Sequence, residues 1–368
     1  MKILITGSNG FISKNLIFHL NETTNFEIFK FNKNNTFEEL KVFFKKVDLI
    51  VHLAGENRSK NYEDFYKNNV YLTNFICNEL IKADKKIPII FSSSIHINKK
   101  NWYGETKKEA EEIILKLNKK NKNPVIIYRL PGVFGKWSKP NYNSVVATFC
   151  NNLANNLPIN IDDKKAELNL IYIDDLVRDI KKSILTNLKG ISYPIIKPEY
   201  KVSLLDIVKQ INSFKISRET LIVENLGDSF QKKLYATYLS FLNNNSFSYP
   251  LKINEDKRGK FVEILKTNKS GQFSFFTAKP GVTRGGHYHH SKSEKFLVVK
   301  GEARFVFKDV ISGFTKTINI SGKNPEVVDT IPGWSHNITN IGNEDLIVFL
   351  WSNEIFDKLN PDTISFNM

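Results

Sequence analysis

Four potential metal ligands stand close together in the C-terminal third of the sequence. His287 and His289 are separated by one residue, Glu294 follows five residues after His289, and His336 lies downstream in a Pro-Gly turn. On a β-strand, residues two apart point to the same face, so His287 and His289 would project together. A carboxylate and a third imidazole complete an N/O ligand set suited to Zn, Mn, Fe or Ni. The pattern predicts a β-sheet domain that holds one divalent metal, and zinc is the ion we expect.

The spacing of these residues forms two sequence boxes. Residues 281–301 read G-x5-H-x-H-x4-E-x6-G, and residues 332–340 read P-G-x2-H-x3-N. Both boxes resemble those of the cupin family, and the resemblance implies a jelly-roll barrel. The sequence from about residue 250 onwards agrees with it, because short alternating β runs are separated there by Gly and Pro turns. In the alternative interpretation, the same barrel holds no metal.

Length and composition limit the class of protein. A chain of 368 residues is long enough for two domains with separate cores, and 41% hydrophobic and 25% charged residues are typical of a soluble protein. The two cysteines, Cys77 and Cys150, lie outside any C-x-x-C spacing, which favours free thiols in a reducing compartment. We find no apolar run that would span a bilayer and no signal-peptide pattern at the start. We therefore expect a cytoplasmic protein without a membrane partner.

The formal net charge of +15 raises the question of nucleic-acid binding. The lysines are scattered, however, and no basic stripe alternates with aromatic residues. We therefore expect no nucleic-acid partner and interpret most lysines as a solvated surface. A milder functional interpretation is that the positive field attracts a polyanionic small molecule such as a nucleotide diphosphate.

The N-terminus predicts a phosphate-binding turn. Residues 2–6 have the character of a buried strand, residues 7–13 read GSNGFIS, and a helical pattern follows over residues 14–20. Glycines at such a turn let the backbone approach a pyrophosphate, and the helix N-terminus presents free N–H groups to it. The turn resembles the G-x-x-G-x-x-G of extended short-chain dehydrogenases, with Ser13 in place of the third glycine. The cofactor-contacting residues expected here are Gly7, Asn9, Gly10, Phe11 and Ile12.

The next two strands indicate which nicotinamide cofactor to expect. The predicted strand at residues 26–31 is followed by Asn32-Lys33-Asn34, where an acidic residue would bind the ribose hydroxyls of NAD. Because Lys33 stands there instead, it would pair with a 2′-phosphate, with Lys30 as a second candidate, so we expect NADPH rather than NADH. Residues 48–53 run into a segment that resembles the H-x-A-G turn of the same family. The cofactor-contacting residues expected in that segment are Leu53, Ala54 and Gly55.

A Tyr-x-x-x-Lys pattern follows the strand at residues 87–91. Tyr103 and Lys107 lie on one face of a predicted helix that continues to residue 117. Lys107 would lower the pKa of the Tyr103 phenol and hold the nicotinamide ribose, which would make the phenol a proton donor to a carbonyl. Ser94 would hydrogen-bond that carbonyl oxygen, with Ser93 as the alternative.

Two later segments resemble the same family and lead to a domain boundary. Residues 125–135 contain R-x-x-x-x-F-G, and residues 169–177 contain the paired Asp174 and Asp175, which we expect to cap a helix. A polar break then precedes the β-rich region. We expect an α/β Rossmann-like, doubly wound parallel sheet of the extended short-chain dehydrogenase type, followed by an all-β cupin barrel. The predicted domains are residues 1–245 and 246–368.

The β-rich region also resembles sugar-nucleotide epimerases of the RmlC type, through residues 256–263 and 284–288. Those epimerases use a histidine at the place of His287 to abstract a proton beside a ketone, and they need no metal. One residue does not serve as ligand and base at once. If His287 is a ligand, the base must come from His290, Lys295, Glu263 or another barrel residue.

The order of the two domains resembles the CapF-type capsular polysaccharide enzymes over the full length. The resemblance implies that the cupin domain epimerises C3 of UDP-2-acetamido-2,6-dideoxy-β-L-arabino-hexos-4-ulose. The N-terminal domain would then reduce C4 with NADPH to UDP-2-acetamido-2,6-dideoxy-β-L-talose, a precursor of UDP-N-acetyl-L-fucosamine. The resemblance also implies a cytoplasmic homodimer. Two alternatives stay open: a 4-ketoreductase with a structural cupin, and a non-redox nucleotide-sugar epimerase or dehydratase that keeps its nicotinamide bound.

Overall fold

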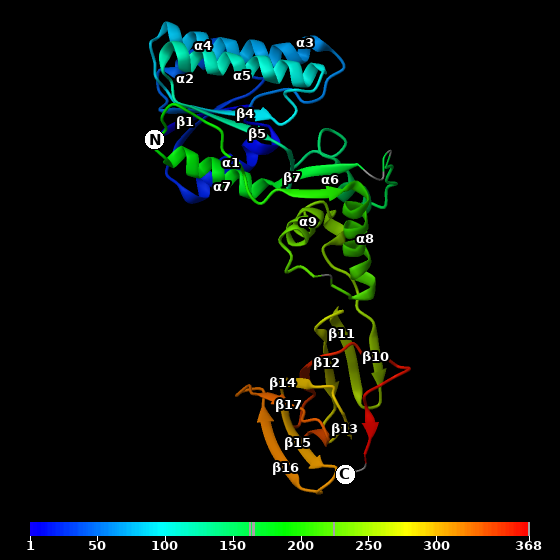
Figure 1. The fold of residues 1–368 in the computed structure, drawn as a ribbon. Coiled ribbons are helices and arrows are strands. Elements are labelled where there is room, and N and C mark those ends of the chain that lie inside the picture. The colour runs from blue at the N-terminus through cyan, green and yellow to red at the C-terminus, as the bar shows by residue number, and fades with distance from the viewer. Residues whose placement is uncertain (162, 164–165, 224, 367–368) are drawn as a thin grey trace. The chain divides into compact units, whose positions relative to one another are not determined.

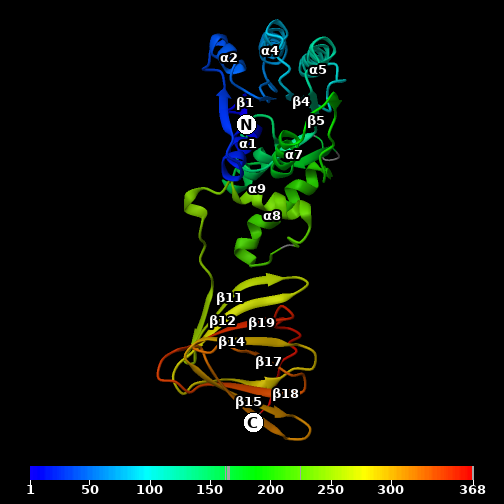
Figure 2. The same ribbon diagram turned by 90° about the vertical axis from the view of Figure 1, so that its left-hand side faces the viewer.

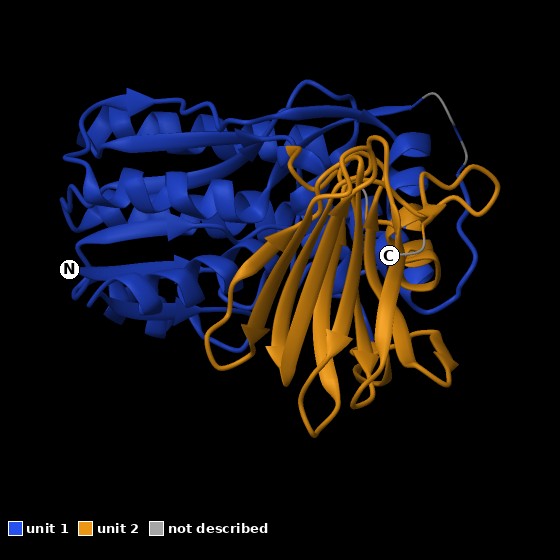
Figure 3. Ribbon diagram, turned by 90° about the horizontal axis from the view of Figure 1, so that it is seen from below, with its two compact units in different colours: residues 1–211, 229–243 blue, residues 212–228, 244–368 orange. Residues whose placement is uncertain are grey.

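The chain folds into two compact units (Figure 3). We call residues 1–211 with 229–243 the first unit, and residues 212–228 with 244–368 the second unit.

None of the helices in the described residues is both long and apolar enough to cross a bilayer. Cys77 and Cys150 are free and buried, and burial raises the pKa of the Cys77 thiol to about 12. The computed structural model describes residues 1–161, 163, 166–223 and 225–366.

A six-stranded parallel sheet with the order β2-β1-β3-β4-β5-β8 forms the centre of the first unit (Figure 1). Parallel sheets are covered on both faces, which explains why these segments are nearly continuous apolar runs. The Rossmann-like sheet predicted from the sequence is confirmed. Its strands are β1 (Lys2–Thr6), β2 (Glu27–Phe31), β3 (Leu49–His52), β4 (Ile89–Ser94), β5 (Val125–Leu130) and β8 (Ile191–Ser192).

Helices cover both faces of this sheet. Side chains alternate along a strand, so Ile3 and Ile5 of β1 pack into one core while Leu4 packs into the other. The first core is closed by α1 (Phe11–Thr23) and α7 (Ile173–Leu185), and the second by α2 (Phe37–Phe44), α4 (Leu72–Lys82) and α5 (Trp102–Asn121) (Figure 1). Two short helical segments lead directly into α4, namely α3 (Tyr62–Phe65) and the π-helical η1 (Tyr66–Tyr71).

A smaller sheet and three helices follow β5. The expected capping of α7 by its aspartates is wrong, because Tyr172 is the N-cap residue and its side chain makes no capping bond. Asp174 and Asp175 lie in the first turn, where their charge is favourable near the helix N-terminus. Asp175 pairs there with Lys233 at 2.7 Å. The elements are β6 (Gly132–Phe134), β7 (Glu167–Tyr172) and β9 (Tyr200–Ser203), with α6 (Val145–Ala154), α8 (Leu204–Thr220) and α9 (Ser229–Leu239).

Two antiparallel sheets face each other in the second unit (Figure 2). Phe296 and Val348 of one sheet and Phe305 and Ile338 of the other share a single apolar core. The expected all-β architecture is confirmed. One sheet contains β10 (Ile253–Asp256), β11 (Gly259–Thr267), β12 (Gly271–Ala278), β19 (Leu346–Ser352), β14 (Glu294–Lys300) and β17 (Val327–Asp329). The other contains β16 (Thr315–Ser321), β15 (Glu302–Asp309), β18 (Trp334–Asn340), β13 (Thr283–Tyr288) and β20 (Ile364–Ser365), and η2 (Asn244–Ser246) precedes both sheets.

The second unit includes residues 212–228, which the sequence boundary at 245/246 assigns to the first domain. Lys266 of β11 exchanges two backbone hydrogen bonds with this segment, one with Leu221 and one with Val223, each at 2.8 Å. Arg218 also donates to the carbonyl of Ser246 at 2.5 Å. Backbone hydrogen bonds can form between any residue types, so the sequence does not reveal this pairing. The compact units therefore differ here from the predicted domains, whose boundary stays a prediction.

Candidate active site and candidate metal centre

The predicted phosphate turn lies between β1 and α1, at the carboxyl edge of the parallel sheet. Gly7 has a φ of +66°, and a Cβ there would fall 2.7 Å from the Cα of Ala54, so only glycine fits. Its carbonyl accepts from the amide of Gly10 at 2.8 Å, and α1 begins at the next residue. In the sheet, β2 lies on one side of β1 and β3 lies on the other, so the order in which strands are added changes side at β1. Such a topological switch point is the usual binding place for a dinucleotide in this type of fold.

The other residues predicted for this turn cluster around it. Asn9 is exposed, while Phe11 and Ile12 are half-buried and pack against the core under α1. Ser13, which stands in place of the third glycine, is buried with its hydroxyl 3.5 Å from the carbonyl of Thr6. A small side chain therefore fits between helix and strand. Just after β3, the amide of Ala54 donates to the hydroxyl of Thr6 at 3.1 Å and brings the second predicted segment next to the first.

Gly55 ends the H-x-A-G segment and lies against Lys107 of α5. A Cβ at this position would lie 2.8 Å from Oδ1 of Asn69 and 3.2 Å from the Nζ of Lys107. Asn69 is buried, accepts from the amide of Glu56 at 2.9 Å and donates to the hydroxyl of Thr106 at 3.1 Å. The side-chain amide of Asn69 therefore links the segment at Glu56 to α5. The sequence analysis did not identify Asn69.

Lys33 is exposed, and its Nζ lies 3.6 Å from a carboxylate oxygen of Glu56. Glu56 is largely buried and accepts from the phenol of Tyr142 at 2.5 Å. Burial, followed by the bond to Glu56, raises the pKa of Tyr142 to about 12. The residue that sequence reasoning assigned to a 2′-phosphate therefore has an acidic neighbour. Glu56 was missed although it directly follows the H-x-A-G segment.

Tyr103, Lys107 and Ser94 come together where α5 begins beside the end of β4. The hydroxyl of Ser94 lies near the phenol of Tyr103 and accepts from the amide of His96 at 3.1 Å. Burial raises the pKa of Tyr103, and the nearby Ser94 hydroxyl acts to lower it. Lys107 is buried and its Nζ donates to the carbonyl of Ser92 at 2.7 Å. The expected lowering of the Tyr103 pKa by Lys107 is not what the structure shows, because burial is the largest effect.

A buried carboxylate, Glu111, lies on α5 one helical turn after Lys107. It accepts from the hydroxyl of Ser93 at 2.6 Å and from two guanidinium nitrogens of Arg129, the shorter contact being 2.5 Å. Ser93 is thereby engaged, which favours Ser94 as the residue that faces a substrate carbonyl. Burial lowers the pKa of Lys107 to about 8, and the charge of Glu111 acts in the opposite direction. Glu111 stands four residues after Lys107, a helical spacing that sequence reasoning overlooked.

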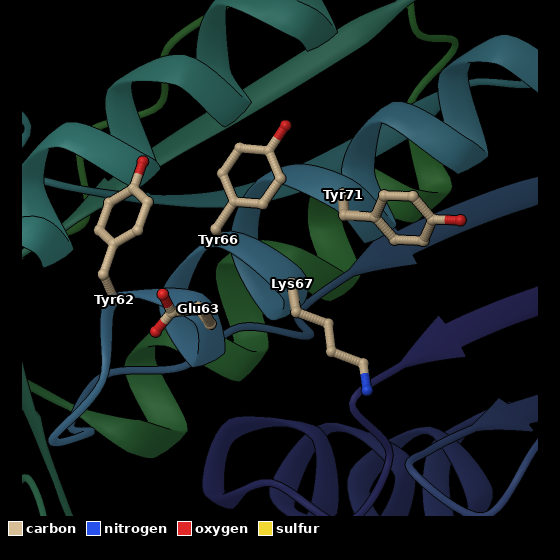
Figure 4. A pocket seen from close by; sticks show the side chains of 5 residues that line it. All are labelled: Tyr62, Glu63, Tyr66, Lys67 and Tyr71. Atoms are coloured by element: carbon tan, nitrogen blue, oxygen red, sulfur yellow. The ribbon is translucent and has the colours of Figure 1, made fainter.

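The first unit also contains a pocket on its surface that is separate from the residues described above. Its volume is about 500 Å³, and Figure 4 shows the side chains that line it on α3 and η1. None of the predicted site residues contributes to the lining. The pocket therefore takes no part in the site described above. Its lining residues are Tyr62, Glu63, Tyr66, Lys67 and Tyr71.

The four predicted metal ligands meet between the two sheets of the second unit. β13 pairs with β18 so that His287 lies opposite His336, His289 directly follows β13, and Glu294 opens β14 in the other sheet. One ligand atom of each residue lies within 4.8 Å of one ligand atom of each of the others. The structure therefore brings together the complete set that the spacing predicted.

Unpaired nitrogens indicate that this cluster fits a cation. His336 is 1% exposed, and among the described residues neither of its ring nitrogens has a hydrogen-bond partner. The Nδ1 of His289 faces the backbone carbonyl of Asp362, which only accepts, so Nδ1 carries the proton. In a neutral ring, Nε2 then turns its lone pair toward a carboxylate oxygen of Glu294 at 3.2 Å. Two lone pairs at that distance need a proton or a cation between them, and the unpaired His336 beside the same oxygen favours a metal ion.

The charges in the cluster suit metal binding. Burial acts to raise the pKa of Glu294, but the neighbouring imidazoles of His289 and His336 and the charge of Lys292 outweigh it and hold the pKa well below its usual range. Burial, helped by the charge of His336, lowers the pKa of His287 to about 4. At neutral pH the carboxylate is ionised and the imidazole of His287 is neutral, which are the forms that bind metals.

The alternative bases for an epimerisation lie elsewhere in the unit. His290 is exposed. Lys295 pairs with Asp329 at 2.6 Å, and Glu263 pairs with Lys266 at 2.8 Å. Both side chains are therefore already engaged in ion pairs. No alternative base is distinguished by this geometry.

Comparisons with known proteins agree with this architecture. Residues 3–193 match the NAD dependent epimerase/dehydratase family, and residues 254–364 match the polysaccharide biosynthesis C-terminal domain. The UDP-2-acetamido-2,6-beta-L-arabino-hexul-4-ose reductase of Pseudomonas aeruginosa is 47% identical over 363 residues, which cover 99% of this chain and 98% of that protein.

Solved structures lead to the same conclusion. The capsular polysaccharide assembling protein CapF of Staphylococcus aureus is 42% identical, with a TM-score of 0.92 and complete coverage of both chains. The UDP-glucuronic acid 4-epimerase of Bacillus cereus, in complex with NAD, is 18% identical with a TM-score of 0.56 over 66% of this chain and 98% of its own, and it shares the fold alone. The chain belongs to the NAD dependent epimerase/dehydratase family and, over its full length, to the CapF-type capsular polysaccharide enzymes.

Proposed function

We propose that the protein is a bifunctional sugar-nucleotide enzyme of capsule or O-antigen synthesis. Its substrate is UDP-2-acetamido-2,6-dideoxy-β-L-arabino-hexos-4-ulose, a UDP-linked 4-keto-6-deoxy amino sugar. The second unit epimerises C3, and the first unit reduces the C4 ketone with NADPH to the L-talose product. The observation that carries this proposal is the grouping of Tyr103 and Ser94 beside the buried Lys107 and the glycine turn, on a chain 47% identical to a reductase named for a UDP-linked hexulose of this kind.

The first-unit residues support carbonyl reduction. The turn from Gly7 would hold NADPH, which would supply a hydride for the carbonyl carbon. The phenol of Tyr103 donates a proton to the carbonyl oxygen, and Ser94 donates a hydrogen bond to the same atom. Lys107, buried and within reach of the Ser92 carbonyl, holds a positive charge beside the reacting groups. Hydride on carbon and proton on oxygen together convert the ketone into an alcohol.

The cofactor preference is part of the same proposal. Lys33 supports NADPH because its ammonium group would pair with a 2′-phosphate. Glu56 acts against this preference, since its carboxylate lies 3.6 Å from the same ammonium group. We expect Lys33 to leave Glu56 for the phosphate, because a phosphate carries more charge and more acceptor oxygens than a carboxylate.

The second-unit residues support proton transfer beside a ketone. Removal of the C3 proton gives an enolate that the C4 carbonyl stabilises, and return of a proton to the opposite face inverts C3 without any net redox change. His287, His289, Glu294 and His336 would hold one divalent cation, which we expect to be zinc. That cation supplies either a local positive charge or a structural link between the two sheets.

One observation favours a simpler alternative, in which the second unit is structural and the protein is a 4-ketoreductase. All four ligand residues, His287 included, would be occupied by the cation, and the alternative bases Lys295 and Glu263 are held in ion pairs. The cytoplasmic location and the homodimer are proposals that follow from the family resemblance alone.

A single reaction in D₂O tests the proposal. Protein, the UDP-4-keto sugar and NADPH are mixed, and the nicotinamide absorbance and the product mass are followed together. Oxidation of NADPH with one deuterium at C3 is the expected result. Oxidation without deuterium would leave the second unit a structural role, and deuterium without net NADPH consumption would favour the non-redox epimerase.

A further inference from the structure

We propose that the C-terminal tail, residues 360–366, positions the metal centre of the second unit and that Asp362 is its positioning residue. This role presupposes the metal site proposed above. None of the four predicted ligands belongs to the tail. The tail nevertheless contacts the chain on both sides of the pair His287 and His289.

The first contact sets the protonation of a ligand ring. The backbone carbonyl of Asp362 accepts from the Nδ1 of His289. Because a carbonyl never donates, this bond holds the proton on Nδ1 and leaves Nε2 free to face the cation. A tail that left this position would expose Nδ1 and release the ring to either tautomer.

The second contact fixes the link between two ligands. The carboxylate of Asp362 accepts from the amides of His290, Ser291 and Lys292 at 2.7 to 2.8 Å, and from the hydroxyl of Ser291 at 3.0 Å. Three successive amides that converge on one carboxylate form a compact anion-binding turn. This turn is the chain segment between His289 and Glu294, so its conformation sets the distance between the two ligands.

The third contact holds the strand of His287. β20 pairs with β13 through Ser365 opposite His287, and the amide of Phe366 donates to the carbonyl of Gly286 at 2.9 Å. The tail is therefore bonded to the backbone at His287 and to the turn after His289. Since binding equilibria are reciprocal, a tail that favours the metal-binding geometry is itself held more firmly when the metal is bound.

Zn²⁺ affinity measures this role directly. The full-length protein is stripped with EDTA and titrated with Zn²⁺ against a chromogenic chelator. Asp362→Asn keeps the shape of the side chain but turns an amide group toward backbone donors, and we expect it to weaken Zn²⁺ binding about 10- to 100-fold. Asp357→Asn is the matched control, because Asp357 accepts from Leu359 and Asn360 within the same C-terminal segment. We expect it to bind Zn²⁺ like the wild type.

Hydrogen exchange of the wild-type protein gives a second readout that requires no variant to fold. The amides of residues 290–292 and 366 should exchange several-fold faster after EDTA treatment than in the Zn²⁺-loaded protein. Equal Zn²⁺ affinity in Asp362→Asn and the wild type, or equal exchange with and without Zn²⁺, would overturn the role of the tail while the metal site stands. Failure of the wild type to bind Zn²⁺ would overturn the metal site and, with it, the role of the tail.

Discussion

The two sites of this chain differ in how completely the protein satisfies their polar groups. In the first unit, Lys107 donates to the Ser92 carbonyl, Ser94 accepts from the amide of His96, and Ser93 donates to Glu111. In the second unit, His336 is buried and neither of its ring nitrogens has a hydrogen-bond partner among the described residues. A site for proton donation can be complete in the protein alone. A cluster that leaves buried nitrogens unpaired is complete only with a cation.

The difference predicts how each site fails. Loss of a catalytic group in the first unit removes one chemical step and leaves the surrounding hydrogen bonds nearly intact. Loss of a ligand in the second unit would remove the cation proposed to link its two sheets, so chemistry and stability should fall together. No residue takes part in both sites, so variants of one should spare the other.

The largest effect is expected for Tyr103→Phe. The substitution removes the phenolic proton donor, and the rate of NADPH oxidation should fall about 10²- to 10⁴-fold. Exchange of the C3 proton in D₂O, measured by the mass of the substrate, should continue at the wild-type rate. Loss of both activities in a correctly folded variant would show that the two sites depend on each other.

The next effect concerns the metal centre. His336→Ala should lose the bound metal and lower the unfolding temperature of the second unit, because a ligand present at 100 times its Kd stabilises the folded state by about 2.7 kcal/mol. Metal content and thermal unfolding with and without EDTA measure both effects. His290→Ala is the control, since His290 is exposed and outside the ligand set. An EDTA response in His336→Ala equal to that of the wild type would contradict the assignment of His336.

The pH dependence of reductase activity tests the roles of the buried charges of Lys107 and Glu111 in the first unit. The pKa of Lys107 is lowered to about 8, so its ammonium group is lost as the pH rises through that value, and reductase activity should fall above pH 8. Glu111 favours the charged lysine, and Glu111→Gln should therefore move this limb to lower pH and reduce the rate about 10-fold at pH 8. Glu112→Gln, an exposed neighbour on α5, should leave the profile unchanged. A Glu111→Gln profile identical to the wild type would remove Glu111 from the site.

The sequence predicted those parts of both sites that depend on local spacing. Tyr103 and Lys107 share a helix face, and His287 and His289 share a strand face, because these periodicities are properties of the backbone. The predicted role of Lys107 in lowering the pKa of Tyr103 failed, since burial is a property of the folded chain and not of the motif.

Long-range partners carried no such signal. Asp362 meets His289 across 73 residues, and Tyr142 meets Glu56 across 86. In the first case the group that accepts is a backbone carbonyl, which every residue has, so no residue type marks it. The pairing of residues 221–223 with Lys266 also runs through the backbone, which explains why a boundary drawn from composition differed from the compact units.

The smallest effect is expected at the cofactor edge. Lys33 is 83% exposed, and exposed ion pairs contribute only about 0.2–1 kcal/mol, so Lys33→Ala should reduce kcat/KM for NADPH about two- to fivefold. The value for NADH should not fall, because that cofactor lacks the 2′-phosphate. Lys46→Ala, also exposed but outside the turn that follows β2, is the control. Glu56→Gln should shift the preference further toward NADPH, since it removes the negative charge that competes for Lys33. If neither Lys33→Ala nor Glu56→Gln changes the ratio of the two kcat/KM values, the preference is set elsewhere, and the edge of the first unit has only a structural role.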